Sequence, residues 1–308
     1  MIKTLREGFV FQRDWTGKGE RGLRDQMLMP AIFFGAISPG LYITALLTDF
    51  IPGLWVSVVL NIAGYGLAHI MYLGRMERFW RGLLNLRHSW ISRGLLFNII
   101  FTISSTGFVV LRSMGTVADS DQYMPVIKWI SFISSLLFLA YPGFMLSFVK
   151  AIPFWHSAVE PLLFFIQGVL GGTAVQLLMG SLFRIDPSVS AGLLKINYLL
   201  VITVLLIILS ALIIKSLHGE AERASVMYLL GIYRGEGRLF LYGALIGGLV
   251  IPLLLLSLFI FYGGHTAVVT ATLYTALILE LTGIYFAKYG FIRAGAYPSD
   301  TIPKREGV

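Results

Sequence analysis

Ionisable and phenolic side chains interrupt long apolar stretches at several points of this 308-residue sequence. Two histidines, two carboxylates and three tyrosines fall at similar depth in these stretches: His69, His156, Glu160, Glu280, Tyr65, Tyr72 and Tyr141. Ionisable groups inside a membrane are costly, so each is a functional candidate. Histidine and glutamate supply and remove protons near neutral pH. Together these side chains suit a lipid-soluble molecule that needs hydrogen bonds and protons, and a quinone meets that description.

Four of the polar residues share one predicted helix. Asn61, Tyr65, His69 and Tyr72 follow one another at intervals of 4, 4 and 3 residues. This spacing places them on one face of a helix. We expect His69 and Tyr72 in its last turn, and Tyr141 about two turns from the end of another helix.

The same residues also have purely structural interpretations. Tyr65 and Tyr72 suit an aromatic belt at the membrane surface, and His156 suits the headgroup layer. Glu160 is placed to interact with the dipole in the first turn of its helix. Glu280 is the hardest to explain structurally because it lies deepest in its apolar stretch.

A b-type haem between His69 and His156 stays open as an alternative, because both lie near one depth. The chain has no cysteine, which excludes iron–sulfur ligation and c-type haem attachment within it. The sequence therefore predicts no resident iron–sulfur cluster, and no haem in the favoured interpretation.

The composition identifies the elements that must position these residues. Hydrophobic residues make up 56% of the chain and charged residues 13%, against roughly 25% charged in soluble domains. The mean hydropathy is +0.79. These values exclude a soluble enzyme, a disordered protein and a nucleic-acid-binding domain despite the net charge of +8. We expect an all-α, polytopic integral membrane protein.

Eight stretches are long enough to span a bilayer core, which takes roughly 20 apolar residues each. They lie near 30–50, 52–73, 94–113, 124–149, 157–182, 190–215, 239–263 and 266–288. The expected organisation is an N-terminal segment (1–29), an eight-helix transmembrane domain (30–291) and a C-terminal tail (292–308).

The distribution of basic residues predicts the orientation. Twenty of the 24 Lys and Arg residues fall in segments on the side of the termini, and four fall on the other side. Short cytoplasmic loops carry the excess of Lys and Arg. Both termini are therefore expected to be cytoplasmic.

A short interfacial helix is expected on that side, over 75–88. Its apolar residues recur at helical spacing: Met76, Phe79, Trp80, Leu83 and Leu84. Such a helix lies in the headgroup plane and contacts membrane lipid. We expect Arg75 to frame the mouth of a binding site. We expect the other arginines of this segment to dock a partner subunit: Arg78, Arg81 and Arg87.

Three stretches resemble a known family. They are LGRMERFWRGLLNLRHSWISRG (73–94), YPGFMLSFVKAIPFWHSAVEPLLFF (141–165) and FIRAGAYP (291–298). In this order they resemble the NrfD, or polysulfide reductase, membrane-subunit family, which includes the DMSO-reductase anchor subunits. The family's second span typically ends in H-L-G-R-P-x-R-F-W. Here Tyr72 replaces the histidine and Met76 the proline, and His69 lies one turn earlier.

The resemblance implies a cofactor-free, non-catalytic electron-transfer subunit in a prokaryotic cytoplasmic (inner) membrane. Such subunits exchange electrons between the quinone pool (menaquinone or ubiquinone) and an iron–sulfur, ferredoxin-like subunit, which commonly serves a molybdopterin-type catalytic subunit. A tyrosine matching Tyr141 belongs to the family's quinone site. The expected roles are headgroup binding by Tyr141, His69 and Tyr72, and proton relay by Glu280 and Glu160.

Two other functions remain open on the residues alone. One is a transporter or proton-translocating module, favoured by Glu280 and by glycine-rich spans. The other is a passive anchor that holds a partner without contacting quinone.

Overall fold

The computed structural model describes residues 9–11, 23–73, 76–115, 123–233, 235–262 and 267–298. Within these residues, eight helical segments are long and apolar enough to cross a membrane. They are Met27–Leu47, Ile51–Leu73, Trp90–Met114, Tyr123–Ser147, Val159–Gly180, Pro187–His218, Leu239–Tyr262 and Val268–Arg293. The predicted all-α, multi-pass architecture is confirmed, with ends that move by a few residues.

The elements in chain order are β1 (Phe9–Phe11), α3 (Leu23–Leu47), α4 (Ile51–Val59), η1 (Leu60–Gly66), α5 (Leu67–Leu73), η2 (Met76–Asn85), α6 (Trp90–Met114), α7 (Tyr123–Ser147), α8 (Val159–Phe183), α9 (Pro187–His218), α10 (Glu220–Leu229), η3 (Gly235–Gly237), η4 (Leu239–Val250), α11 (Ile251–Tyr262), α12 (Ala267–Arg293) and β2 (Ala296–Pro298).

Local capping explains where two spans begin earlier than the hydropathy indicates. The Ser89 hydroxyl accepts a hydrogen bond from the Ser92 amide, so α6 starts at Trp90. The Asp186 carboxylate accepts one from the Ser188 amide, which starts α9. A side-chain acceptor before the first turn satisfies amides that have no helical partner.

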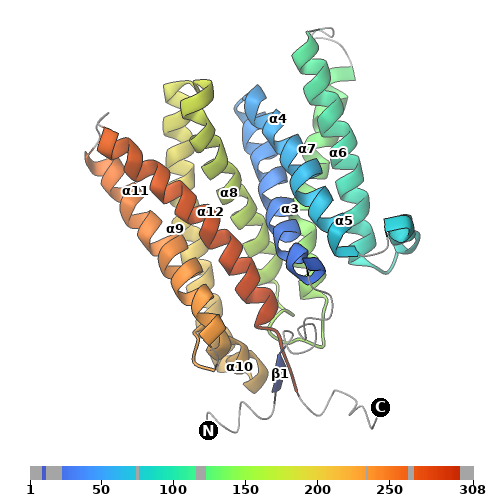
Figure 1. The fold of residues 1–308 in the computed structure, drawn as a ribbon, viewed down its shortest axis with the longest axis vertical. Coiled ribbons are helices and arrows are strands. Elements are labelled where there is room, and N and C mark those ends of the chain that lie inside the picture. Colours follow the sequence, from blue (N-terminus) through green and yellow to red (C-terminus); the bar gives the residue numbers. More distant parts are fainter. Residues whose placement is uncertain are drawn as a thin grey trace.

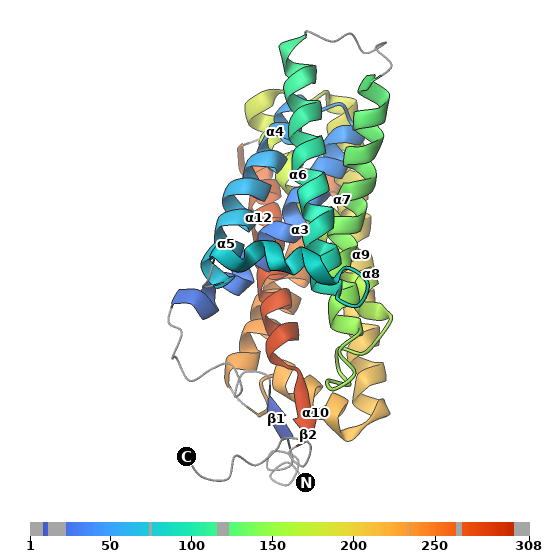
Figure 2. The ribbon, with the colours of Figure 1, turned by 90° about the vertical axis from the view of Figure 1, so that its right-hand side faces the viewer.

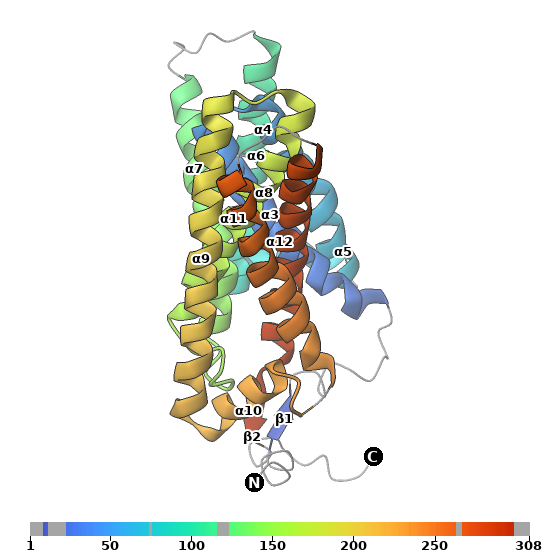
Figure 3. The ribbon, with the colours of Figure 1, turned by 90° about the vertical axis from the view of Figure 1, so that its left-hand side faces the viewer.

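The helices form two groups on either side of α3 (Figure 1). The segments α4, η1, α5, α6 and α7 lie on one side, and α8, α9, η4, α11 and α12 lie on the other. Helix α3 packs against both groups, chiefly against α8, α7 and the second span. Figure 3 shows the second group from its outer face.

Glycines allow the closest helix crossings. A side chain at Gly40 of α3 would collide with the carbonyl oxygen of Gly168 on α8, and Gly248 of η4 meets Gly283 of α12 backbone to backbone. Small residues let membrane helices approach closely and pack without an aqueous driving force. The first contact holds α3 closely against α8, and the second holds η4 against α12 within the second group.

The second span is not a uniform α-helix. Its middle, η1, has π-helical hydrogen bonding, and α4 and α5 continue it on either side. Such segments widen a helix locally and occur frequently at functional sites. This one carries Asn61 and Tyr65, both of which are buried.

The predicted interfacial helix is present as a 3₁₀ helix, η2, rather than an α-helix. It runs across the spans near their ends (Figure 2). Phe79, Trp80 and Leu84 on η2 are exposed in the isolated chain, as expected for side chains that meet lipid.

The two strands lie at one end of the bundle. β1 and β2 pair antiparallel, with Val10 opposite Tyr297. Phe11 stacks on Tyr228 of α10, with ring centroids 5.1 Å apart. Both ends of the described chain therefore lie at the same end of the bundle, as an even number of spans requires.

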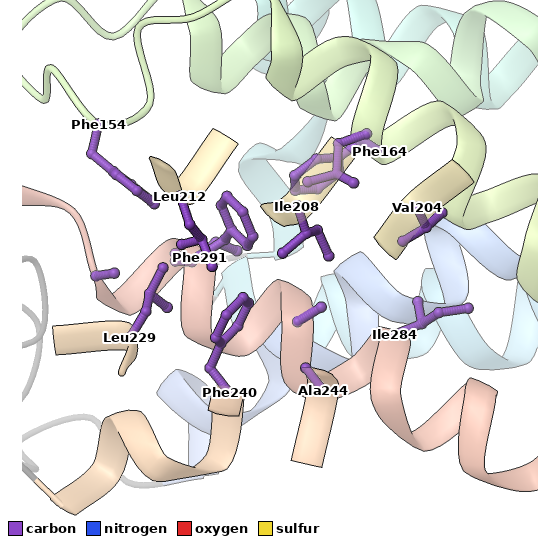
Figure 4. Close-up of a cluster of buried hydrophobic side chains, with 14 of the residues drawn as sticks. Phe154, Phe164, Val204, Ile208, Leu212, Leu229, Phe240, Ala244, Ile284 and Phe291 are labelled. Atoms are coloured by element: carbon purple, nitrogen blue, oxygen red, sulfur yellow. The ribbon is translucent and has the colours of Figure 1, made fainter. Parts of the chain in front are cut away.

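An aromatic cluster joins this end to the second helix group (Figure 4). Phe291 of α12 contacts Phe154 and Phe240, with centroid distances of 5.4 and 5.6 Å. Leu212 of α9 and Leu229 of α10 lie against the same cluster. This packing fixes the segment before α8 against α9 and α12.

Candidate functional site

Two tyrosines from different spans meet inside the first helix group. The phenol oxygens of Tyr65, on η1, and Tyr141, on α7, lie 3.5 Å apart. Tyr65 is 6% exposed. The π-helical turn and the position of Tyr141 before Pro142 direct both rings into the space between α3, α6 and α7. Each phenol carries one hydroxyl proton, and a hydrogen bond between the two oxygens uses only one of the two protons. The other proton is available to a ligand.

Glycines and aromatic rings form the walls around this pair. A side chain at Gly94 of α6 would collide with the Tyr141 ring, and one at Gly35 of α3 would approach Tyr65. Phe138 stacks on Tyr141 at 5.7 Å and meets Tyr65 edge-on at 5.1 Å. The tyrosine pair is therefore held from three helices in a largely apolar environment.

His69 extends the pair toward the surface. Its ring stacks on Tyr65 with centroids 5.3 Å apart, and it lies 6.5 Å from the Tyr72 ring. Both His69 and Tyr72 are partly exposed. The structure thus brings Tyr65, His69 and Tyr141 together, with Tyr72 at their outer edge; we call these four residues the tyrosine site.

A polar network beside the tyrosine site includes residues that sequence reasoning missed. Asn61, one turn before Tyr65, donates to the Thr102 hydroxyl at 2.7 Å, and Asn98 donates to the Asn61 side-chain oxygen at 3.0 Å. The signal that could have found them is a polar pair four residues apart in the third apolar stretch. This network joins the π-helical turn to α6.

The carboxylates lie in the second helix group. Glu160 of α8 pairs with Lys215 of α9, Oε1 to Nζ 2.6 Å, and both side chains are buried. Lys215 also donates to the Phe154 carbonyl oxygen and lies over the Phe154 ring. Glu160 lies in the first turn of α8, as expected, but it makes no capping hydrogen bond there and pairs with Lys215 instead.

Glu280 lies deeper in the same helix group. Asn197 of α9 donates to Glu280 Oε2 at 3.0 Å and to the Thr173 hydroxyl of α8 at 3.1 Å. Toward the other end, Gln176 donates to the hydroxyl of Thr48, the residue that follows α3, at 2.6 Å. Glu280 and Asn197 are fully buried.

Six of the seven residues expected in one site are thus divided between the two helix groups. No hydrogen bond in the described part of the chain joins Glu160 or Glu280 to the tyrosine site. Sequence indicates the depth of each residue but not the face of the helix it occupies in the fold. In the sequence, Lys215 counts among the basic residues that predict the membrane orientation, because it lies near the end of a span. Only the packing shows that it pairs with Glu160.

His156 lies apart from both groups of residues. It is exposed, and its Nδ1 lies 2.6 Å from the Ser147 carbonyl oxygen. It lines an open groove of about 640 Å³ between α7 and α8, with Phe144, Phe148 and Phe165. No contact joins His156 to His69 among the described residues, and the His69 ring stacks on Tyr65 instead. Among the described residues no group of three or more His, Cys, Asp or Glu converges as a metal site.

The arginines expected to dock a partner are at the surface. Arg78 and Arg81 on η2, and Arg87 after it, are all exposed. Arg81 lies 5.6 Å from the centroid of the Trp80 ring. Arg75 lies outside the described residues.

Comparison with known proteins agrees with this architecture. The family model described as polysulphide reductase, NrfD, matches residues 26–297. A search of the curated proteins finds no match. The family match indicates a membrane subunit of a redox complex, and members of the family partner with iron–sulfur and catalytic subunits in general. Because the match extends from the first span to the second strand, the chain belongs to the polysulphide reductase NrfD family.

Proposed function

We propose that this chain is the quinone-handling membrane subunit of a respiratory oxidoreductase, with the tyrosine site as its headgroup site. The observation that carries the proposal is the partly buried pair of Tyr65 and Tyr141 hydroxyls. A separation of 3.5 Å is long for an O–H···O hydrogen bond, whose usual length is about 2.7–2.8 Å. A carbonyl or hydroxyl oxygen of a ligand therefore competes well for the same protons.

The residues of the site suit a quinone ring. A bound quinone supplies two-electron, two-proton redox chemistry, and the protein supplies binding, orientation and proton handling. Tyr141 donates to a headgroup oxygen while Tyr65 orients it, and Phe138 provides an apolar wall. His69 can exchange a proton near neutral pH at the outer edge of the site.

Most of the tyrosine site lies on the span that leads into η2, which suits electron exchange with a partner subunit bound there. The arginines of η2 follow directly on the span that carries Tyr65 and His69. We propose that Arg78, Arg81 and Arg87 dock an iron–sulfur subunit there. In this proposal a molybdopterin-type subunit completes the complex, and both termini and η2 face the cytoplasm of a prokaryote, where the excess of basic residues lies.

The experiment is a gentle purification of the chain with its bound subunits from the native membrane. Subunit composition and iron content are measured first, and a quinol analogue is then titrated against the sample. We expect a co-purifying iron–sulfur protein and saturable binding that weakens in Tyr141→Phe. Binding that is unchanged in Tyr141→Phe and in His69→Ala would instead indicate a passive anchor, and a chain with neither metal partner nor quinol binding would contradict the proposal.

A further inference from the structure

Several buried polar atoms of the second helix group have no hydrogen-bond partner among the described residues. Those on α8, α9 and α12 are Glu160 Oε2, Gln176 Oε1, Asn197 Oδ1, Glu280 Oε1 and Lys288 Nζ. Most buried polar side-chain atoms in proteins have a partner in protein or ordered water. Five unsatisfied atoms on three adjacent helices therefore require a common explanation.

Lys288 is the most unusual of these residues. It is 2% exposed, and its Nζ lies 3.9 Å from the centroid of the Phe164 ring. A cation over an aromatic face recovers only part of the cost of burying a charge. In the sequence this lysine counts among the orientation signals, because it lies near the end of the last span.

The contacts between α8 and α12 fix where Lys288 lies. On α8, Glu160, Phe164 and Gly171 follow one another along the helix, and Phe164 contacts Lys288. A side chain at Gly171 would meet Ile284 of α12, one turn before Lys288. The two helices therefore run antiparallel here, with Lys288 at the level of Phe164, one turn of α8 beyond Glu160.

Lys288 also lies between Glu160 and Glu280. Glu280 precedes it by eight residues on α12, about 12 Å along the axis. Helical side chains lean toward the N-terminus of their helix, which directs the Lys288 side chain toward Glu280. The buried Gln167 follows Phe164 by three residues on α8, in the interval between the lysine and Glu280.

We propose that Glu160, Lys288 and Glu280 form a proton-transfer path through the second helix group, separate from the tyrosine site and completed by internal water. The path begins at the Lys215–Glu160 pair, at the end of the bundle where β1 and β2 lie. It ends at Glu280. The path rests on the proposed function only for the source of its protons. It adds to that function by naming Lys288 as an obligatory member of the proton relay.

Each transfer conserves protons. The Lys288 ammonium gives a proton through water to the Glu280 carboxylate and becomes a neutral amine. Glu160, a carboxylate while it is paired with Lys215, takes up one proton from the terminal side and passes it to the neutral Lys288 amine, and the reverse transfers return protons along the same path. Internal water typically makes about three hydrogen bonds to buried polar groups, and the unsatisfied atoms of Glu160, Lys288, Asn197 and Glu280 supply such partners along the path.

A structural role alone would be served better by other side chains. Replacing buried ionisable groups by apolar ones of similar volume is often neutral or stabilising. Lys288 packs against a phenyl ring without an ion pair among the described residues, so methionine would fill the same space. A role in proton transfer therefore accounts for a lysine at this position, whereas packing alone does not.

The test is infrared spectroscopy of the full chain, with any subunits that co-purify, in lipid nanodiscs transferred from H₂O to D₂O. The carbonyl band of the protonated Glu280 carboxyl is the one that disappears in Glu280→Gln. Its shift in D₂O reports the exchange of the carboxyl proton for deuterium. We expect exchange in the wild type to be slowed about tenfold or more in Lys288→Met, equivalent to a barrier at least about 1.4 kcal/mol higher. Lys195→Met, an exposed lysine of α9 at the other end of the bundle, is the control and should exchange as the wild type.

Circular dichroism melting shows whether each variant is folded, and Lys288→Gln replaces Lys288→Met if the latter is not. Unchanged exchange in a folded Lys288 variant, or no exchange in the wild type, would overturn the path. Quinol-analogue binding is measured on the same samples. Loss of binding with intact exchange in Tyr141→Phe keeps the two sites separate, whereas no quinol binding in the wild type would contradict the proposed function and leave the path standing.

Discussion

Tyr65 and Tyr141 are separated by 76 residues in sequence, and their phenol oxygens lie 3.5 Å apart inside the first helix group. One residue comes from a π-helical turn of the second span and the other from the fourth span. A buried pair of hydroxyls in an apolar environment is costly unless its hydrogen bonds are satisfied. The pair therefore offers a polar ligand hydroxyl groups whose hydrogen bonds are not fully used.

Removing the Tyr141 hydroxyl should weaken quinol binding without unfolding the chain. A neutral hydrogen bond contributes about 0.5–1.5 kcal/mol, so we expect an affinity for a quinol analogue up to about tenfold lower in Tyr141→Phe. The measurement is a fluorescence or calorimetric titration of the purified subunit. Tyr123→Phe, an exposed tyrosine of the same helix, should bind as the wild type; equal affinities in both variants would remove Tyr141 from the site.

Gly94 should be intolerant of any side chain. A Cβ atom there would overlap the Tyr141 ring, so Gly94→Ala should displace the ring, lower the melting temperature and reduce quinol binding. A Cβ atom at Gly107 of the same helix would meet no other atom within 4 Å. Gly107→Ala should therefore be neutral, or stabilising by up to about 0.5–1 kcal/mol through helix propensity.

The contrast between the two glycines is measured by thermal unfolding in the same detergent, with quinol binding as the second readout. A Gly94→Ala variant that melts and binds as Gly107→Ala does would show that the tyrosine ring is not confined by α6.

The Glu160–Lys215 pair should be strongly coupled. Removing one partner of a buried ion pair typically costs about 3–5 kcal/mol, because the other charge is left uncompensated. We expect Lys215→Met to lower stability by an amount of this order and the double variant Glu160→Gln/Lys215→Met to recover much of it. Denaturant unfolding of the four chains gives the coupling energy.

Lys150, which is exposed, provides the matched control, and Lys150→Met should change stability by less than about 0.5 kcal/mol. Additive effects of the Glu160 and Lys215 substitutions would contradict the buried pair.

Hydropathy predicts the number and position of the spans because the membrane acts on each segment separately. Helical spacing also places Tyr65 and His69 on one helix face, since that relation is local. The direction in which each face points depends on neighbouring helices, so the separation of Glu280 from the tyrosine site could not be predicted. Lys215 and Lys288 escape sequence reasoning for the same cause: a lysine near the end of a span commonly extends to the surface, and only packing shows that these two do not.

The arginines of η2 should determine how strongly the partner binds. Arg78 and Arg81 are exposed, and exposed charges act mainly through complementarity with the opposite surface. Arg78→Glu/Arg81→Glu should therefore release the proposed iron–sulfur subunit at lower salt than the wild type does, since salt screens such contacts over about 8–10 Å. The measurement is co-purification across a salt series, with iron retained on the membrane subunit as the readout. Lys128→Glu reverses an exposed charge at the other end of the bundle and should leave the salt profile unchanged. If the two profiles coincide, the partner does not dock on η2.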